Sequence, residues 1–322
     1  MEPASLERPS LAVVHLIRAD GVERFRAFID SYRAHPAGVD HELVLLFKGL
    51  ASSGDAAPYL SLAEDLAPRA MFVDDDGFDL TAYAKAGALL ESEQLCFLNS
   101  HSLILHGGWL ANLQRALAPD VGIAGATGSW NSTLSGWRYL RHLPSPYRSV
   151  FPDRRWFVAE TEAMAAEGAP AAEGPPTRFA EARSAMVRSG ETLYCQLAFL
   201  PFPACHVRTN AFIVSSRTLR RLRFWPMRRK AQAWRLESGR GGITRQLQAM
   251  GLRTLVVGRD GVGYGPREWP GSNTLWQEDQ QNLLVADNQT EAYRRGSRDR
   301  RELLSRLAWG NEARPTAPEP PA

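Results

Sequence analysis

Two apolar runs of this chain each end in a cluster of polar side chains. Ala70–Val73 is followed directly by Asp74–Asp76, and Leu95–Leu98 is followed by Asn99–Ser102, which reads Asn-Ser-His-Ser. Carboxylate, amide and imidazole groups can hydrogen-bond small polar molecules or ligate a cation. Because parallel strands of an α/β sheet bind ligands beyond their carboxyl ends, this pattern predicts a binding site there.

The elements that must position these groups alternate along the chain. Apolar runs at Leu11–Ile17, Glu42–Phe47 and Val121–Ala124 predict further buried strands, and a helix-like segment follows each of the first four strands. Strands that alternate with helices predict a mostly parallel sheet with right-handed crossovers. The predicted fold class is therefore α/β.

The alternation stops after Gly125. Residues 129–203 are aromatic and basic with little periodicity, and we interpret them as an irregular insertion over the sheet edge. A strand is expected at 208–214, then a short helix capped by Ser216, a helix from about Gly242 to Met250 and a last strand at 255–257. Residues 1–10 and 311–322 are expected to be disordered, which leaves a single domain at 11–310.

Composition narrows the function classes. The 322 residues are 44% hydrophobic and 23% charged, as in soluble globular proteins, and a net charge of only +3 argues against a dedicated nucleic-acid binder. Cys96, Cys195 and Cys205 match no zinc or disulfide spacing, and Cys96 is expected in the core. No apolar run approaches the roughly 20 residues that span a bilayer. We therefore expect a cytoplasmic protein without a transmembrane segment, and peripheral membrane association stays open.

The segment Phe97–Leu113 reads FLNSHSLILHGGWLANL. It resembles the stretch fLNPDT with its tryptophan-leucine helix in GT-A glycosyltransferases, in particular the family 2 type that builds bacterial surface polysaccharides. Asp76–Asp79 stands where that family's chain lies against the nucleotide, and Trp234–Gly251 is similar to the family's segment with the catalytic base. The resemblance covers residues 11–261 in order and rhythm. It implies a GT-A (Rossmann-like), mostly parallel sheet flanked by helices, with a C-terminal lid segment.

By this resemblance the chain transfers a sugar from a nucleotide-sugar donor to a glycan or lipid-linked acceptor, with inversion in a single displacement. A carboxylate near the acceptor must take its proton, and Glu237, expected just before a helix, is the candidate base. The alternative for Glu237 is an acid that stabilises a helix N-terminus. Asp260 is a weaker candidate, with a turn as its alternative.

The donor side needs hydrogen bonds to the nucleotide and cations for the diphosphate. Asp76, Asp79 and Asn99 are the candidates for the nucleotide, against helix capping for Asp79 and a turn for Asn99. Arg208, Lys230 and Arg240 are the candidates for charge neutralisation, against solvated surface charges.

Two departures from the family concern this same site. The loop after the second strand begins Lys48-Gly49-Leu50, without the family's acid, and His101 replaces the metal-binding carboxylate of the DxD motif. The implied cofactor is Mn²⁺ or Mg²⁺ with His101 as a ligand. Imidazole ligates manganese, whereas magnesium prefers oxygen.

Two rival hypotheses remain. The first is a degenerate GT-A module that binds a sugar nucleotide or a partner without turnover. The second is a nucleic-acid or anionic-surface binder that uses Arg220–Arg235 with its interleaved aromatic residues. Within the insertion, Trp130 and Trp137 are either sugar-stacking platforms or core residues. Asp287–Thr290 is interpreted as part of a lid or as a capped turn.

Overall fold

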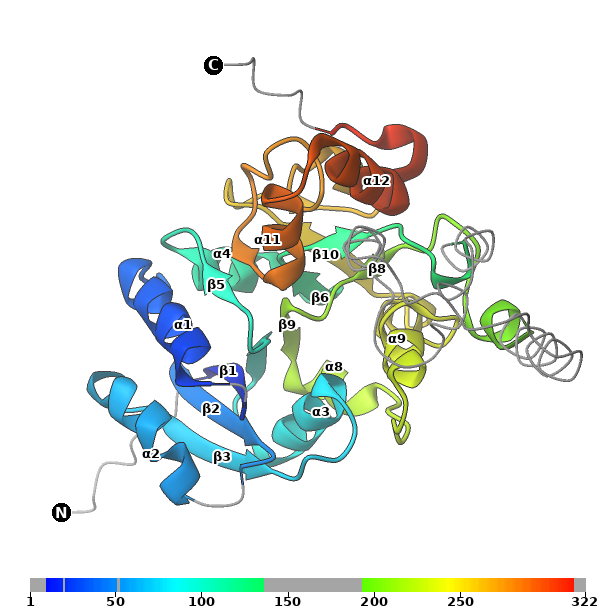
Figure 1. Ribbon diagram of the computed structural model, residues 1–322. Helices are drawn as coiled ribbons and strands as arrows, with labels where there is room; N and C mark the ends of the chain where they lie inside the picture. The colour runs from blue at the N-terminus through cyan, green and yellow to red at the C-terminus, as the bar shows by residue number, and fades with distance from the viewer. Residues whose placement is uncertain (1–9, 20, 51–52, 136–192, 316–322) are drawn as a thin grey trace, which may run out of the picture.

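The computed structural model describes residues 10–19, 21–50, 53–135 and 193–315. Its centre is an eight-stranded sheet in the order β11-β10-β6-β9-β4-β1-β2-β3 (Figure 1). The strands are β1 (Leu11–Arg18), β2 (Glu42–Lys48), β3 (Arg69–Val73), β4 (Gln94–Leu98), β6 (Val121–Gly125), β9 (Ala211–Ser215), β10 (Arg253–Val257) and β11 (Gly263–Tyr264).

Six of these strands run in the same direction. β1 is parallel to β2 and β4, β2 is parallel to β3, and β6 is parallel to β10. β9 lies antiparallel between β4 and β6, and β11 is antiparallel to β10. The predicted α/β class with a mostly parallel sheet is therefore confirmed.

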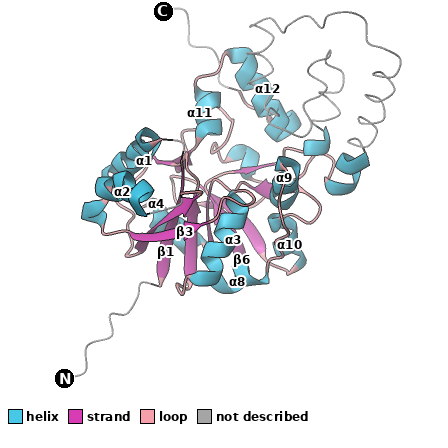
Figure 2. Cartoon of the chain, turned by 60° about the horizontal axis from the view of Figure 1, so that its bottom comes forward, coloured by secondary structure: helices cyan, strands magenta, loops and turns pink. Residues whose placement is uncertain are grey.

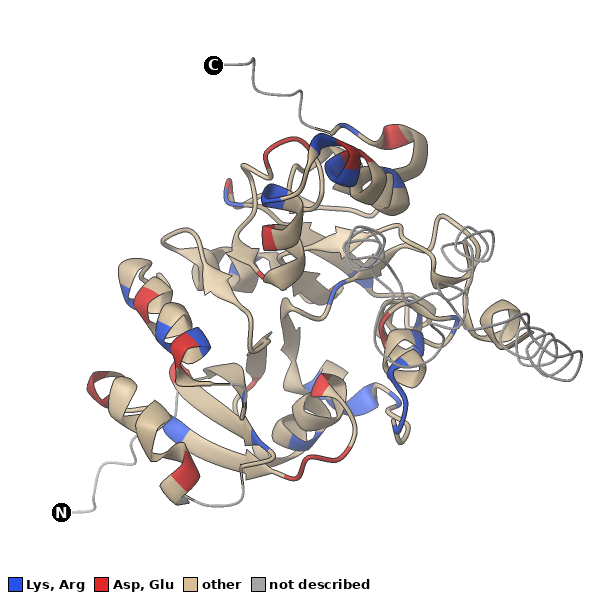
Figure 3. Ribbon diagram, in the orientation of Figure 1, with Lys and Arg blue, Asp and Glu red and all other residues tan. Residues whose placement is uncertain are grey.

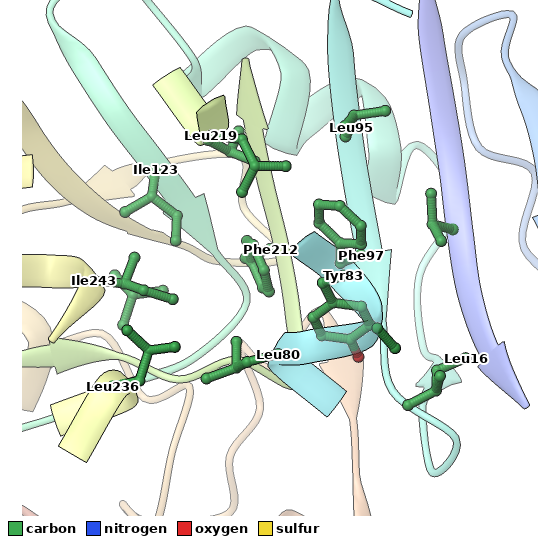
Figure 4. Close-up of a cluster of buried hydrophobic side chains, with 14 of the residues drawn as sticks. Leu16, Leu80, Tyr83, Leu95, Phe97, Ile123, Phe212, Leu219, Leu236 and Ile243 are labelled. Carbon is green, nitrogen blue, oxygen red and sulfur yellow. The ribbon is translucent and has the colours of Figure 1, made fainter. Parts of the chain in front are cut away.

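Side-chain alternation along the strands assigns the two faces of the sheet. In β1, Ala12, Val14 and Leu16 face one core, whereas Leu11 and Val13 face the other. The first core is covered by α3 (Asp79–Leu89), α8 (Ser216–Arg221), α9 (Lys230–Ser238) and α10 (Ile243–Ala249), seen in Figures 2 and 4. The second is covered by α1 (Val22–Ala34), α2 (Ser53–Leu62) and α4 (Trp109–Ala116).

The C-terminal part of the chain packs onto the first core. α11 (Asn288–Arg294) and α12 (Arg298–Trp309) contribute Tyr293, Leu304 and Trp309 to it. Two short ribbons flank the main sheet, β5 (Leu103–Ile104) with β12 (Val285–Ala286) and β7 (Gly128–Ser129) with β8 (His206–Val207). The described residues also form the 3-10 turns η1 (Glu64–Leu66), η3 (Trp269–Gly271) and η4 (Gly310–Glu312).

The predicted β-α order of the first 125 residues is confirmed, and Cys96 lies in the core as expected. The cap of α8 was predicted wrongly. Ser215, not Ser216, is the N-cap, because its hydroxyl oxygen accepts the backbone N–H of Thr218 while the Ser216 hydroxyl donates to the Ser92 carbonyl. The strand expected at 208–214 begins only at Ala211.

The predicted insertion is described only at its two ends, and Trp137 lies outside the described residues. Trp130 is a packed residue, with its ring edge-on to Trp309 at 6.0 Å between centroids and its Nε1 donating to the Pro266 carbonyl. The expected C-terminal tail is held at its start. The backbone N–H of Arg314 donates to Gln277, and the Arg314 carbonyl accepts from the N–H of Glu278.

Candidate functional site

Charged residues gather where β1, β2 and β3 end. Arg18 and Lys48 are the last residues of β1 and β2, and the aspartates follow β3. We call this group the acidic-loop cluster; it comprises Arg18, Lys48, Lys85, Asp74, Asp75, Asp76 and Asp79. The strands are parallel, so their carboxyl ends bring the group to one edge of the sheet.

Lys48 is the most buried member of the cluster. Its side chain is 1% exposed, and its Nζ lies 2.5 Å from Oδ1 of Asp75, whose side chain is 76% exposed. Gly49 has a φ of +76°, which glycine adopts readily, so the chain can turn here. A Cβ at this position would also lie only 3.0 Å from the Asp75 Cβ. The Lys48 ammonium group is therefore buried, and the carboxylate that pairs with it is open to solvent.

The neighbouring aspartates are neutralised by the chain's own cations. Lys85 Nζ lies 2.6 Å from Asp76 Oδ1 and 3.5 Å from Asp74 Oδ2. The hydrogen bond from Lys48 lowers the pKa of Asp75, and the hydrogen bond from Lys85 lowers the pKa of Asp76. The two lysines therefore favour the ionised forms of Asp75 and Asp76.

Asp79 does not cap α3. Phe78 is the N-cap residue and makes no side-chain cap. Asp79 instead lies 2.5 Å from Arg18 Nη2, with both side chains slightly more than one third exposed. A pair this exposed opens at little cost, so both groups can turn to a ligand.

Asn99 shapes the turn after β4. Its Oδ1 accepts the backbone N–H of His101 and the hydroxyl of Ser102, each at 3.0 Å. Its backbone N–H donates to the Asn210 carbonyl, which joins the turn to the start of β9. The expected alternative of a turn residue is thus realised at Asn99, and it leaves the side-chain amide nitrogen as the group that can meet a ligand.

Glu237 reaches the same edge of the sheet by a different route. It lies in the last turn of α9, not just before a helix as predicted. Its Oε1 accepts both the backbone N–H and the hydroxyl of Thr209, each at 2.8 Å. Thr209 directly precedes Asn210, whose carbonyl accepts from the backbone N–H of Asn99. The Glu237 carboxylate is therefore held next to the Asn99 turn.

Tyr83 lies in the core beneath these groups. Its hydroxyl is buried and has no hydrogen-bond partner in the described part of the chain. The same holds for Arg18 Nε, Thr81 Oγ1 and Asn210 Nδ2. Burial raises the pKa of Tyr83 most, and Asp79 and Glu237 raise it further. In Figure 4 the hydroxyl oxygen lies on the side of Leu16, towards the carboxyl end of β1. Four polar atoms without partners thus surround one edge of the sheet.

The three cations predicted to neutralise a diphosphate lie in different places. Lys230 Nζ is 5.5 Å from the centroid of the Phe78 ring, at the start of α3. Arg208 is held inside the protein, with Nη2 2.7 Å from Asp287 Oδ2 and side chains 15% and 1% exposed. Arg240 is exposed and donates at 3.4 Å to the Gln196 carbonyl. Of the three, Lys230 lies beside the acidic-loop cluster.

Asp287 caps the helix α11, where a lid segment or a capped turn was expected. Its Oδ1 accepts the N–H groups of Gln289 and Thr290 at the start of α11. Together with the Arg208 ion pair, this cap fastens the C-terminal segment to the connection before β9. Arg208 therefore positions the chain around Thr209.

Asp260 forms a turn, which was its expected alternative. Its Oδ2 accepts from the Tyr264 hydroxyl at 2.5 Å and from Asn282 at 3.0 Å. Burial and the bond to Asp260 raise the pKa of Tyr264 to about 12. These residues line an open hollow of 590 Å³ at the end of β10. The hydrogen bonds account for Asp260 without any catalytic role.

The described residues do not fit a divalent metal ion. In the part of the chain that the structure describes, no group of three or more His, Cys, Asp and Glu side chains could hold one. Near His101 the amide oxygen of Asn99 is already used by the turn. We therefore assign no step of the reaction to a metal.

Sequence reasoning missed Arg18, Lys48, Asp75 and Thr209. Arg18 and Lys48 each end an apolar run, and a charged residue in that position was the available signal. Asp75 was visible as an acid, but its partner lies 27 residues away. Thr209 gave no signal, because its role depends on the contact with α9.

Comparisons with known proteins give a likeness of fold alone. No protein-family profile matches the chain, and no curated protein matches it. A mannosyltransferase, PcManGT from Pyrobaculum calidifontis, solved with GDP-Man and Mn²⁺, is similar at 13% identity and a TM-score of 0.44, over 84% of this chain and 61% of that chain.

Two further solved structures are similar at lower TM-scores. The galactosyltransferase LgtC, solved with donor and acceptor sugar analogues, has 11% identity and a TM-score of 0.34 over 65% of this chain and 59% of its own. The bifunctional glycosyltransferase WbbM has the same identity and TM-score over 68% of this chain and 33% of its own. The chain thus spans less than two thirds of each of the three proteins. All three TM-scores lie below 0.5, so function has to be argued from this chain's own residues.

Proposed function

We propose that this chain is a glycosyltransferase of the GT-A type, which moves a sugar from a nucleotide-sugar donor to a glycan or lipid-linked acceptor. The observation that carries the proposal is the convergence of Glu237 and the acidic-loop cluster on one edge of the sheet. The antiparallel strand β9 between β4 and β6 makes this possible, because it brings Thr209 and its partner Glu237 to the Asn99 turn. More specifically, we propose a family 2 member that acts in the cytoplasm in the synthesis of bacterial surface polysaccharides.

The cluster would bind the donor's nucleoside. Arg18 and Lys48 offer hydrogen-bond donors, while Asp75, Asp76 and Asp79 offer acceptors for base and ribose. The family's acid after the second strand is replaced in this chain by Lys48, and Asp75 supplies a carboxylate beside it from the next loop. The half-exposed pairs can exchange partners with a nucleotide at low cost.

The reaction would proceed as a single displacement. The acceptor hydroxyl oxygen forms a bond to the anomeric carbon, and the bond from that carbon to the diphosphate oxygen breaks with its electron pair. The hydroxyl proton passes to Glu237, whose Oε1 is held by Thr209, so that Oε2 would accept the proton. Lys230 offsets the charge that builds on the leaving diphosphate. Attack opposite the leaving group inverts the anomeric centre.

The test is the release of nucleoside diphosphate from a panel of nucleotide sugars with glycan and lipid-linked acceptors. Glu237→Gln is expected to lower kcat by roughly 100- to 10,000-fold, because the amide can still accept from Thr209 but cannot take a proton. Glu302→Gln is the matched control, since Glu302 forms an exposed pair with Arg306 on α12. It should leave kcat unchanged.

Two results would count against the proposal. A Glu237→Gln variant as active as the wild type would remove Glu237 as the base. A wild-type protein that binds a nucleotide sugar but turns over none of the acceptors would favour the non-catalytic GT-A module.

A further inference from the structure

Positive charge is segregated on one layer of the fold. Between Arg217 and Arg245, a segment that runs from α8 through α9 to the first turn of α10, there are ten Lys and Arg residues and one acid, Glu237. This segment therefore carries a formal charge of +9. The whole chain carries +3, so the remaining residues carry −6. Figure 3 shows the basic residues on α8, on the loop that follows and on α9.

None of these ten cations has a carboxylate partner among the described residues. All ten are exposed, and none forms an ion pair within the described residues. Elsewhere most described cations face an acid, as Arg33 faces Asp65 and Arg253 faces Asp120. Ten unpaired charges repel one another, so an anionic partner would stabilise this face.

Exposed apolar side chains border the basic layer. Leu193 and Leu197 are 56% and 69% exposed and lie four residues apart in the helical segment 193–198, so they share one side of it. The segment touches the layer through the backbone N–H of Arg240, which donates to the Ala198 carbonyl at 2.9 Å. Cations and protruding leucines are therefore found on adjoining surfaces.

We propose that this surface docks the protein on a membrane that carries anionic lipid headgroups. The arginines attract the headgroups, and the leucines insert among the acyl chains at the interface. A nucleic acid explains the surface less well. Its bases need open aromatic faces, whereas Trp225 is half-buried and Arg235 covers its ring at 5.2 Å from the centroid.

Docking of this kind goes beyond the proposed reaction. It would bring the protein to the surface where a lipid-linked acceptor resides. Among the described residues no helix is long and apolar enough to cross a bilayer, so attachment would be at the surface. Vesicle binding requires neither donor nor acceptor, so its failure and the failure of the glycosyltransferase proposal are distinguishable.

The test is sedimentation of the full chain with vesicles of phosphatidylcholine alone or with added phosphatidylglycerol. Binding is expected only with the anionic lipid and should fall as salt is raised. Replacing Arg221, Arg223 and Arg228 with glutamine should weaken partitioning about 100-fold. The control removes three paired cations instead, through Arg26→Gln, Arg294→Gln and Arg306→Gln, and should retain binding.

A second pair of substitutions tests the apolar component. Leu193→Ser with Leu197→Ser should weaken binding to anionic vesicles while leaving its salt dependence unchanged. The proposal is overturned if wild-type protein does not sediment with anionic vesicles at low salt, or if the two triple variants bind alike. Tighter binding to a single-stranded oligonucleotide, unaffected by the leucine substitutions, would assign the surface to nucleic acid instead. Melting curves of all variants establish that each is folded.

Discussion

Two charged regions of this protein treat their cations in opposite ways. In the acidic-loop cluster, Arg18, Lys48 and Lys85 each face an aspartate at 2.5 or 2.6 Å. In the layer of α8–α10, ten cations face no carboxylate among the described residues. The first region alternates donors and acceptors over a few ångströms, whereas the second is almost entirely basic, with Glu237 as its one acid.

The difference teaches what each region can recognise. Alternating donors and acceptors fit a small ligand that has both kinds of group, such as a nucleoside, and they favour geometry over charge. A field of one sign attracts any extended anion and is screened by salt. Substitutions in the first region should therefore change ligand affinity, and substitutions in the second should change surface binding.

The largest effect on stability is expected where an ion pair is fully enclosed. Arg208→Ala leaves the Asp287 carboxylate, 1% exposed, without its cation, and should lower the free energy of unfolding by about 3–5 kcal/mol. Urea denaturation measures this. Arg306→Ala removes an exposed pair and should change the free energy by less than about 0.5 kcal/mol. Equal effects for the two variants would show that burial does not govern the value of pairing in this protein.

The next largest effect on stability is its dependence on pH, which we attribute to buried histidines and not to either charged region. Burial lowers the pKa of His15, stacked on Phe28, from 6.5 to about 3, and burial also lowers the pKa of His206. The unfolded chain then binds protons that the folded protein does not. Stability is therefore complete above pH 6.5 and declines as the pH falls towards 3.

At pH 5 the contribution of His15 to this loss is about 2 kcal/mol. His15→Leu should flatten the slope of unfolding free energy between pH 7 and pH 5, as measured by chemical denaturation at each pH. Asp75 and Asp76 stay ionised in this range, because their cations lower their pKa values. An unchanged slope in the variant would contradict the assignment to His15.

At Lys48 we expect a small effect on stability and the most specific effect on ligand binding. Lys48→Met keeps the buried volume, and Asp75 stays hydrated because it is 76% exposed, so the unfolding free energy should change by less than about 1 kcal/mol. Loss of a charged hydrogen bond should weaken nucleotide-sugar binding by about 10- to 100-fold in a calorimetric titration. Arg221→Gln, in the unpaired layer, should leave this affinity unchanged. If both variants bound equally well, the two regions would not differ as described.

The part of the fold that could be predicted from the sequence is the part that depends on local hydrophobic periodicity. Apolar runs and helical spacing gave the strands and helices up to Gly125 in the right order, because each run packs against one of two cores. The position of β9 could not be predicted. An antiparallel strand between β4 and β6 is a choice of tertiary pairing, and residues 211–215 contain no mark of it.

The sequence indicated candidate site residues at the strand ends, but it did not indicate the side-chain contacts that join distant segments. Asp76, Asp79 and Asn99 were proposed as site residues because they follow apolar runs, and the structure places them at the carboxyl ends of β3 and β4. The placement of Glu237 was wrong because α9 has no side-chain N-cap to mark its start. Pairs such as Lys48 with Asp75 and Thr209 with Glu237 join residues 27 and 28 positions apart, and only the folded chain brings them together.

The most direct test of the central claim is a thermal-shift screen of nucleoside diphosphates and nucleotide sugars, each with and without manganese. A ligand that binds only the folded state raises the melting temperature by mass action. We predict a shift with a nucleotide sugar that does not require manganese, that persists in Glu237→Gln and that shrinks in Lys48→Met. The absence of a shift with every nucleotide sugar at millimolar concentration, with or without manganese, would contradict the assignment of this edge of the sheet to a sugar-nucleotide site.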